Sequence, residues 1–303
     1  MVEEACAEVR RLNALQFQKE TSNLLEALLP QSRRVLSRAS EAIESEDDYR
    51  LFAVADAGVV VGAICLDASD FYLCVAGSLP ELVARQLLHY IVEEFGADFD
   101  GLRGCDGPPE AVDALTRVQQ SLKECNALER PPLELMILDK EPQPPAGVPG
   151  ALRAVAPKDR ILPTLALWFK QFEQDTQEQA YSTEAAYQGQ SQLTSDLSAA
   201  AGRGDLFVWI VKEKPVAMVI LGRSRPKQVF CVFTVPHHRG RGYGQAATAA
   251  ACAEFRNRTG GAEPIMLSSV TKFGASRVYE RCGFRSAGWL HSVSFQSDAA
   301  ACA

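Results

Sequence analysis

The chain has 303 residues, of which 47% are hydrophobic and 23% charged, with a formal net charge of −7. This length is typical of two domains, and the composition excludes a wholly disordered or fibrous chain. No apolar run approaches the ~20 residues that cross a bilayer, and the acidic start Met1-Val2-Glu3-Glu4 is unlike a signal peptide. We therefore expect a cytoplasmic protein that has no membrane partner.

The cysteines and the charges narrow the possible partners further. Nine cysteines are scattered without a C-x-x-C pair, so we expect no metal site and free thiols in a reducing compartment. Residues 1–150 hold 13 basic and 26 acidic side chains, whereas residues 151–303 hold 18 basic and 12 acidic ones. The net negative charge argues against nucleic acid as a partner, but the basic second half favours an anion.

A segment rich in proline and glycine divides the chain. Four prolines and two glycines lie within residues 140–150, a composition that can continue neither a helix nor a central strand. We place a linker at 141–150, between an N-terminal domain at 1–140 and a C-terminal domain at 151–303.

Hydrophobic periodicity predicts an α+β arrangement in each half. In the first half it predicts two helices within 17–43, strands at 51–55, 59–66 and 71–76, helices at 81–95 and 111–122, and a strand at 133–138. In the second half it predicts a strand at 152–156, helices at 163–174 and 183–200, strands at 206–211, 216–221 and 229–235, a helix at 245–256, a strand at 264–268, a helix at 273–282, and strands at 284–289 and 292–295. The similar order of elements indicates a duplicated fold, although no residue-level repeat is visible.

A glycine-rich turn between the strand at 229–235 and the helix at 245–256 carries the strongest chemical signal. It reads Arg239-Gly240-Arg241-Gly242-Tyr243-Gly244. The glycines allow positive φ and a close approach of backbone N–H groups to a ligand, and the arginines add positive charge. The turn matches neither a Walker loop nor a dinucleotide fingerprint. It predicts a pyrophosphate site at a helix start, against the alternatives of a ligand-free turn or an RNA contact.

These residues resemble the phosphate motif Arg/Gln-x-x-Gly-x-Gly/Ala of the GNAT superfamily of acyl-coenzyme-A-dependent N-acetyltransferases. A second family feature, a helix ending in Tyr followed by Gly-Phe, stands at Tyr279 and Gly283-Phe284. The match covers about 151–295. The stretch Phe233-Thr234-Val235-Pro236 with Arg239-Gly240-Arg241-Gly242-Tyr243 is most similar to a bacterial-type tandem subgroup, in which a degenerate N-terminal GNAT-like half precedes the active one. The equivalent turn in the first half has one glycine, Gly77, and no base, so we expect it not to hold a pyrophosphate.

The resemblance implies an α+β fold of two GNAT-like domains, each a mostly antiparallel central sheet flanked by helices. It implies acetyl-CoA as co-substrate, no metal, and transfer of the acetyl group to a primary amine of a small molecule or peptide by direct attack in a ternary complex. Tyr279 takes the family position of the acid that protonates the departing thiolate. The implied cofactor-binding residues are Phe233, Thr234, Val235, Arg239, Gly240, Arg241, Gly242, Tyr243, Gly244, Gln245, Ser268 and Ser276.

The backbone N–H of Phe233 or Val235 is the expected donor to the thioester carbonyl. Two positions depart from the family pattern: Lys272 stands where many relatives have Asn, and Ser269 where they often have Asp. The resemblance implies that the Asn helps to hold the cofactor, so Ser268, Ser269 or Ser276 would make that cofactor contact here.

Several questions stay open at this stage. The general base is one of Glu173, Asp205, His237 and His291, or a water chain. Tyr279 has a competing interpretation as a packing residue. A non-catalytic acyl-CoA-binding or regulatory module, transfer of another acyl group, and transfer to a hydroxyl are alternative functions. The sequence leaves the amine acceptor and the oligomeric state open.

Overall fold

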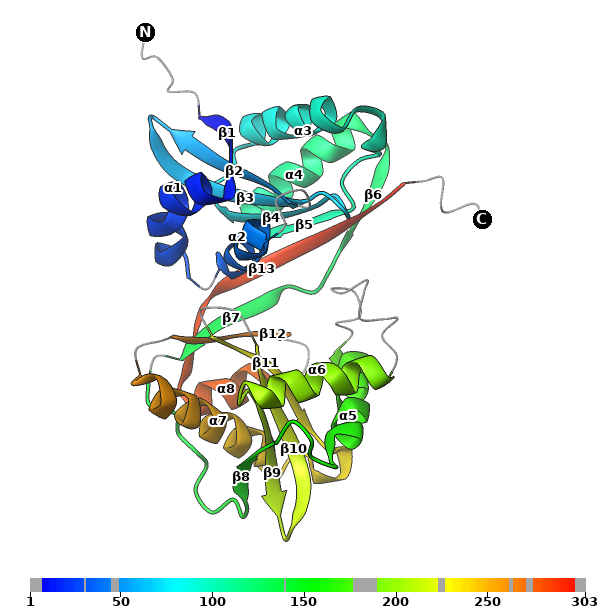
Figure 1. The fold of residues 1–303 in the computed structure, drawn as a ribbon. Helices are drawn as coiled ribbons and strands as arrows, with labels where there is room; N and C mark the ends of the chain where they lie inside the picture. The colour runs from blue at the N-terminus through cyan, green and yellow to red at the C-terminus, as the bar shows by residue number, and fades with distance from the viewer. Residues whose placement is uncertain are drawn as a thin grey trace. The chain divides into compact units, whose positions relative to one another are not determined.

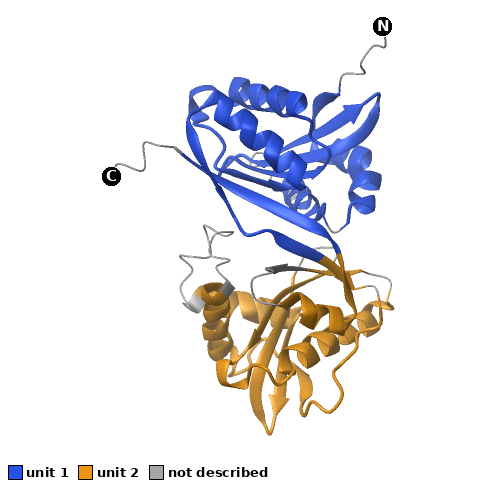
Figure 2. Ribbon diagram, turned by 180° about the vertical axis from the view of Figure 1, so that it is seen from behind, with its two compact units in different colours: residues 1–135, 287–303 blue, residues 136–286 orange. Residues whose placement is uncertain are grey.

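The structure is a computed structural model that describes residues 7–29, 31–44, 49–138, 140–176, 190–222, 227–261, 264–270 and 275–297. The chain forms two compact units (Figure 2). Unit 1 takes residues 1–135 and 287–303, and unit 2 takes residues 136–286.

The elements of the first half follow one another as Figure 1 labels them. They are β1 (Glu8–Leu12), α1 (Ala14–Ala27), α2 (Arg33–Glu44), β2 (Tyr49–Asp56), β3 (Val59–Asp67), β4 (Tyr72–Gly77), α3 (Glu81–Phe95), a 3-10 turn at Gly96–Asp98, β5 (Gly104–Gly107), α4 (Pro109–Leu122), β6 (Cys125–Glu129) and β7 (Leu133–Leu138).

The second half repeats this order, except that one strand follows its last helix where two follow α4. It contains β8 (Ala151–Ala154), α5 (Leu162–Thr176), α6 (Gln190–Gly202), β9 (Leu206–Val211), β10 (Lys214–Leu221), β11 (Lys227–Thr234), a 3-10 turn at Pro236–His238, α7 (Tyr243–Thr259), β12 (Ile265–Val270), α8 (Ala275–Cys282) and β13 (Phe284–Ser297). The predicted α+β class is confirmed, since helices flank a mixed sheet in both units.

The sheet of unit 1 has the strand order β1-β2-β3-β4-β5-β13, and β6 also pairs with β13. Neighbours are antiparallel except for the parallel pair β4 and β5. Side chains alternate between two cores, since successive strand residues face opposite sides. Phe52 packs with α3 and α4 on one face, whereas its neighbour Leu51 packs with α1 and α2 on the other.

The sheet of unit 2 has the corresponding order, β8-β9-β10-β11-β12-β7. Its parallel pair is β11 and β12, in which Lys227, Gln228 and Val229 oppose Ile265, Met266 and Leu267. One face packs against α7, and the other packs against α5 and α6. In both units, therefore, a helix follows the fourth strand and leads to a parallel fifth strand.

The last strand of each sheet comes from the other half of the sequence. Strand β7 ends the first half, yet Met136 and Leu138 belong to the core of unit 2. Strand β13 ends the second half, yet Val293 and Phe295 belong to the core of unit 1. The compact units therefore differ from the division at 140 and 151 that the linker suggested, because the two closing strands are exchanged.

Several predicted elements change in detail. The runs at 284–289 and 292–295 form one strand, β13, since its outer part pairs with β5 and β6. Strands β1, β5 and β6 were not predicted. The predicted helix at 183–200 is described from Gln190 as α6, and the one at 273–282 from Ala275 as α8; the earlier residues of both lie outside the described ranges.

Candidate functional site

The glycine-rich loop lies between β11 and α7, as predicted. Gly240 has φ 76° and Gly242 has φ 80°, both in the left-handed region that favours glycine. Gly242 is the N-cap of α7, and no side chain in the described part of the chain hydrogen-bonds to this helix start. The first helical bond runs from Ala246 N to Gly242 O at 2.9 Å. The earlier N–H groups of the first turn have no acceptor within the helix.

The three glycines are needed for different reasons. A Cβ atom on Gly240 would meet none of the described residues within 4 Å, so this residue faces open space among them. On Gly242 it would stand 3.0 Å from Val148 Cγ2, and on Gly244 it would stand 3.0 Å from Thr234 Oγ1. Gly242 and Gly244 therefore allow close packing with the linker and with β11. Gly240 is the position that leaves room for a ligand.

Arg239 is tied to the fold around the loop. Its Nη2 lies 2.5 Å from Asp175 Oδ2 on α5, its Nε donates to Thr234 O at 3.0 Å, and its guanidinium lies over the Phe233 ring. Arg241 is exposed and leaves the loop basic. No acidic residue lies in the first turn of α7. The positive end of the helix dipole and the charge of Arg241 thus both make the electrostatic potential at the loop more positive.

The hydrogen-bond direction along β11 corrects one expectation. Val235 N donates to Val216 O at 3.1 Å, so this N–H is not available to a ligand. Because N–H groups alternate in direction along a strand, Phe233 N–H also points toward β10. The Thr234 N–H points away from β10. It lies on the same side of the strand as the Thr234 carbonyl, which accepts a hydrogen bond from Arg239 Nε. Thr234 replaces Phe233 and Val235 as the backbone donor that this edge can offer.

The side chains of Phe233 and Tyr243 serve the core. Phe233 is 2% exposed and lies 5.8 Å from Trp168, measured between ring centroids. Tyr243 is buried among residues of α7 and the sheet. Gln245 presents its carbonyl to Cys282 Sγ at 3.6 Å and so links α7 to α8. Tyr243 and Gln245 can meet a ligand through their first-turn N–H groups.

Tyr279 and Ser276 lie one helical turn apart on α8. Tyr279 is half-buried, and its ring packs edge-on against Phe284 with centroids 6.1 Å apart. Ser276 Oγ is buried without a hydrogen-bond partner among the described residues. A buried hydroxyl of this kind requires a water or a ligand group. Ser268 and Ser269 belong to β12, but their side chains lie outside the description, as does Lys272.

The structure places the four candidate bases in different surroundings. Asp205 is 3% exposed and is paired with Lys227 Nζ at 2.8 Å and Arg203 Nε at 3.2 Å, so it is a structural ion-pair residue. His291 belongs to unit 1, where it opposes Gly107 on β5. Of the four candidates, Glu173 and His237 therefore remain as possible bases in unit 2.

The environments of these two groups differ. Burial raises the pKa of Glu173 on α5, although Lys170 opposes the shift. His237 is exposed and lies against His238. The pKa of His238 is lowered by desolvation and by the charges of His237, Arg241 and Lys214. A neutral His238 near pH 7 adds no charge to the loop.

Sequence analysis missed the residues that hold the loop in place. Asp175 lies 64 positions from Arg239, and Val148 belongs to the linker. No local pattern signals either contact. Among the residues that the structure describes, no group of His, Cys, Asp or Glu could hold a metal ion. Within the same residues, no helix has the length and apolar character needed to cross a membrane.

The fold and the loop together define a protein of two similar α+β halves, the second of which carries a glycine-rich loop directly before a helix start. Residues 164–284 match the model of the Acetyltransferase (GNAT) family. The C-terminal half of the chain thus matches the GNAT acetyltransferase family, and the predicted resemblance of this half is confirmed.

Solved structures extend the likeness of fold to the whole chain. A GCN5-related N-acetyltransferase from Sphaerobacter thermophilus is 13% identical, with a TM-score of 0.60 over 96% of this chain and 95% of that one. A GNAT-family acetyltransferase from Colwellia psychrerythraea is 12% identical, with a TM-score of 0.53 over 95% and 100%. A GCN5-related N-acetyltransferase from Kribbella flavida is 19% identical, with a TM-score of 0.51 over 89% and 97%. No curated protein is similar enough in sequence to match.

Proposed function

We propose that unit 2 binds the pyrophosphate of acetyl-coenzyme A at the start of α7 and transfers the acetyl group to a primary amine. The observation that carries the proposal is this helix start, which no side chain of the described residues caps and which is formed by two glycines with left-handed φ, Gly240 and the N-cap Gly242. Unpaired N–H groups and the positive helix end suit a phosphate. The backbone of residues 240–245 would hold the pyrophosphate, and Arg241 would add charge.

The chain offers groups for each step of the transfer. The amine nitrogen forms a bond to the thioester carbonyl carbon while the carbon–sulfur bond breaks. The amine proton passes to Glu173 or His237, directly or through water, and the departing thiolate takes a proton from Tyr279. The Thr234 N–H, at the open edge of β11, is placed to polarise the carbonyl oxygen. Ser276, whose buried hydroxyl has no hydrogen-bond partner among the described residues, supplies a further polar contact, and Ser268 stays a predicted one.

The corresponding place in unit 1 does not suit this ligand. Helix α3 starts after Pro80, which has no N–H, and carries Glu81 in its first turn. The preceding Gly77 packs against β3, since a Cβ there would stand 2.4 Å from Val61 O. Unit 2 is therefore proposed as the sole acyl-CoA site.

The acceptor is proposed to be a primary amine of a small molecule or peptide. A reducing, cytoplasmic location fits the seven described cysteines, all of which are free thiols. The test is to incubate the full chain with acetyl-CoA and a library of primary amines while free thiol is measured. Thiol release that depends on one amine class would support the proposal. Tight coenzyme A binding without turnover would favour a regulatory module, and no thermal shift with millimolar coenzyme A would refute the site.

A further inference from the structure

Strand β11 contains a β-bulge at Phe230. Val229 and Cys231 oppose consecutive residues of β10, so Phe230 between them is an extra residue with no opposite partner on that strand. Strict alternation would place Phe230 and Cys231 on opposite faces of the sheet. Cys231, however, belongs to the core that packs against α5 and α6, and the Phe230 ring also stacks on Phe169 of α5, with centroids 6.0 Å apart. The bulge has therefore turned this side chain toward α5.

Phe230 belongs to an aromatic surface of unit 2, which we define as the partly exposed rings of Trp168, Phe172 and Phe230. Phe230 is 47% exposed, and the other two are half-buried. Two buried rings support this surface. Phe169 contacts both Phe172 and Phe230, and Phe233 lies 5.8 Å from Trp168 between centroids. Single exposed hydrophobic residues are common on proteins, but three partly exposed rings on one packed support favour contact with a flat apolar group.

The aromatic surface lies on the same helix as a candidate base. The middle of α5 meets β11 through Trp168, and Asp175 near the end of α5 pairs with Arg239 of the glycine-rich loop. Glu173 lies between these two contacts along α5, directly after Phe172. A group that covers the aromatic surface is therefore next to the carboxylate proposed to accept the amine proton.

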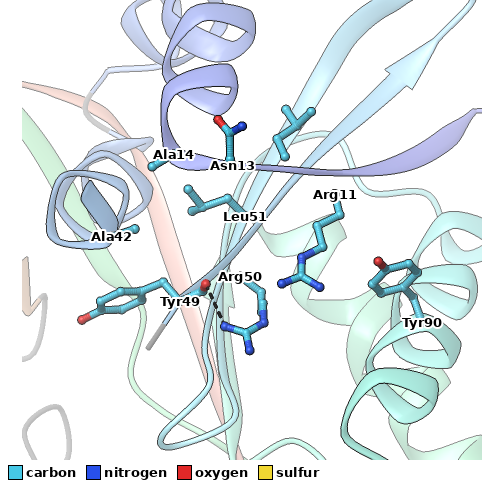
Figure 3. Close-up of a pocket in the computed structure, with 9 residues that line it drawn as sticks. Arg11, Asn13, Ala14, Ala42, Tyr49, Arg50, Leu51 and Tyr90 are labelled. Atoms are coloured by element: carbon cyan, nitrogen blue, oxygen red, sulfur yellow. Dashed lines mark hydrogen bonds between the residues drawn. The ribbon is translucent and has the colours of Figure 1, made fainter. Parts of the chain in front are cut away.

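The cavity of unit 1 does not suit a cationic amine. It has a volume of about 530 Å³, and Arg11 and Arg50 are among its lining residues (Figure 3). Glu94 Oε1 lies 2.9 Å from Arg11 Nη1 and accepts from Arg50 Nε at 2.5 Å. Two guanidinium groups and one carboxylate leave a positive charge that repels an ammonium ion. Beside the aromatic surface, in contrast, the charges of Glu173 and Lys170 balance.

We propose that the amine acceptor is an arylalkylamine whose flat ring lies on the aromatic surface, with Phe230 as its specificity-determining residue. This rests on the proposed acyl transfer, because it names the substrate class of that site. An acetyl group is too small to cover three rings, so the aromatic group comes with the acceptor. Its ring would gain stacking contacts and lose contact with water, and its amine would lie beside Glu173.

The first test is steady-state kinetics of the full chain with acetyl-CoA and four amines. We expect kcat/KM to fall from tryptamine to 2-phenylethylamine to 2-cyclohexylethylamine to n-butylamine, by about tenfold or more between the first and the last. Equal values for the phenyl and cyclohexyl amines would mean that the surface selects apolar groups in general, and would overturn the aromatic class. Equal values for all four amines would overturn the inference and leave the acyl transfer intact.

Variants of Phe230 locate the effect. Phe230→Ala should raise KM for tryptamine about tenfold and leave KM for n-butylamine and the Kd of coenzyme A nearly unchanged, because it removes stacking alone. Phe230→Leu, which keeps an apolar side chain, should have the same selective effect if the alanine variant is unstable. The control is Leu167→Ala, an exposed apolar position on α5 whose loss should change neither amine. An equal rise in KM for both amines, or no rise, would overturn the inference.

Calorimetric titration with 2-phenylethylamine, at saturating coenzyme A, gives a measurement that needs no turnover. Saturable binding that Phe230→Ala weakens, in a chain that acetylates no amine, would support the aryl amine site and refute the acyl transfer. Turnover of alkylamines without binding of 2-phenylethylamine would do the reverse. A preference for benzoyl-CoA over acetyl-CoA that Phe230→Ala abolishes would assign the aromatic surface to the acyl donor and overturn the inference.

Discussion

Gly107 lies so close to Val75 that a Cβ atom on Gly107 would stand 3.0 Å from the Val75 carbonyl oxygen. The two residues extend the parallel register of β4 and β5, in which Cys74 opposes Asp106. In unit 1 the fourth and fifth strands thus stay in contact, and no ligand can enter between them there. We predict that the full chain binds one coenzyme A. Calorimetric titration measures this stoichiometry directly, and a value of two would show that unit 1 also binds.

The loop prediction uses two glycines near opposite ends of α7. Gly240→Val places a side chain in the open space beside the proposed phosphate position and should lower coenzyme A affinity at least tenfold. Its control is Gly260→Val, because Gly260 caps the other end of α7 with φ 68° and also has open space around its Cβ position. Each variant should cost about 1–2 kcal/mol of stability from the left-handed backbone. Equal loss of affinity in both would mean that strain, not the site, explains the effect.

The Tyr279 prediction separates chemistry from packing. Tyr279→Phe keeps the ring against Phe284 and removes only the hydroxyl. We expect kcat to fall ~100-fold or more, the usual contribution of a general acid, while coenzyme A affinity changes little. Steady-state kinetics and thermal shift together measure both quantities. A fall of less than ~3-fold would mean that the thiolate takes its proton from another group.

Variants of Arg239 and its partner Asp175 test whether Arg239 has a structural role or a ligand-binding role. Its contacts with Asp175 and Thr234 make it a tie between α5, β11 and the loop. If this tie is its main contribution, Asp175→Asn should weaken coenzyme A binding about as much as Arg239→Gln. If Arg239 contacts phosphate instead, only Arg239→Gln should weaken binding, and the loss should shrink as salt is added. Titrations at low and high salt distinguish the two outcomes.

The cysteines give a pH-dependent prediction. Burial raises the pKa of Cys282 to about 12 and raises those of Cys65, Cys105 and Cys252 as well. Since the thiolate is the reactive form, these thiols should resist iodoacetamide at pH 8 in the native protein. They should react fully once the chain is unfolded. Peptide mass spectrometry measures this, and fast native labelling of Cys282 would contradict it.

The elements with a strong hydrophobic periodicity were predictable from the sequence, whereas the short elements were not. Helix α3 and strand β9 have the predicted bounds because their apolar residues follow one period throughout. Strand β5 reads Gly-Cys-Asp-Gly, which has almost no strand propensity, and it forms because β4 and β13 pair with it. The glycine loop was predictable since its residues are contiguous. The tie from Arg239 to Asp175 was not, because it joins distant parts of the chain.

The strand exchange could not be predicted from the sequence either. Two phenylalanines of β13 allow a matched test of it. Phe295 near the end of this strand belongs to the core of unit 1, whereas Phe284 at its start belongs to the core of unit 2. Truncation of a buried Phe to Ala typically costs about 3–5 kcal/mol. Phe295→Ala should therefore speed hydrogen exchange in β4, β5 and α4, and Phe284→Ala should speed it in α7 and β12.

Exchange followed by mass spectrometry on the full chain resolves the two patterns. If residues 151–303 formed one independent domain, both variants would loosen the same elements, those of unit 2. The exchanged arrangement predicts separate patterns because each unit takes its last strand from the other half of the chain. It also predicts that a fragment of residues 151–303 is poorly stable, since β12 would lack β7 and the outer part of β13 would expose Val293 and Phe295.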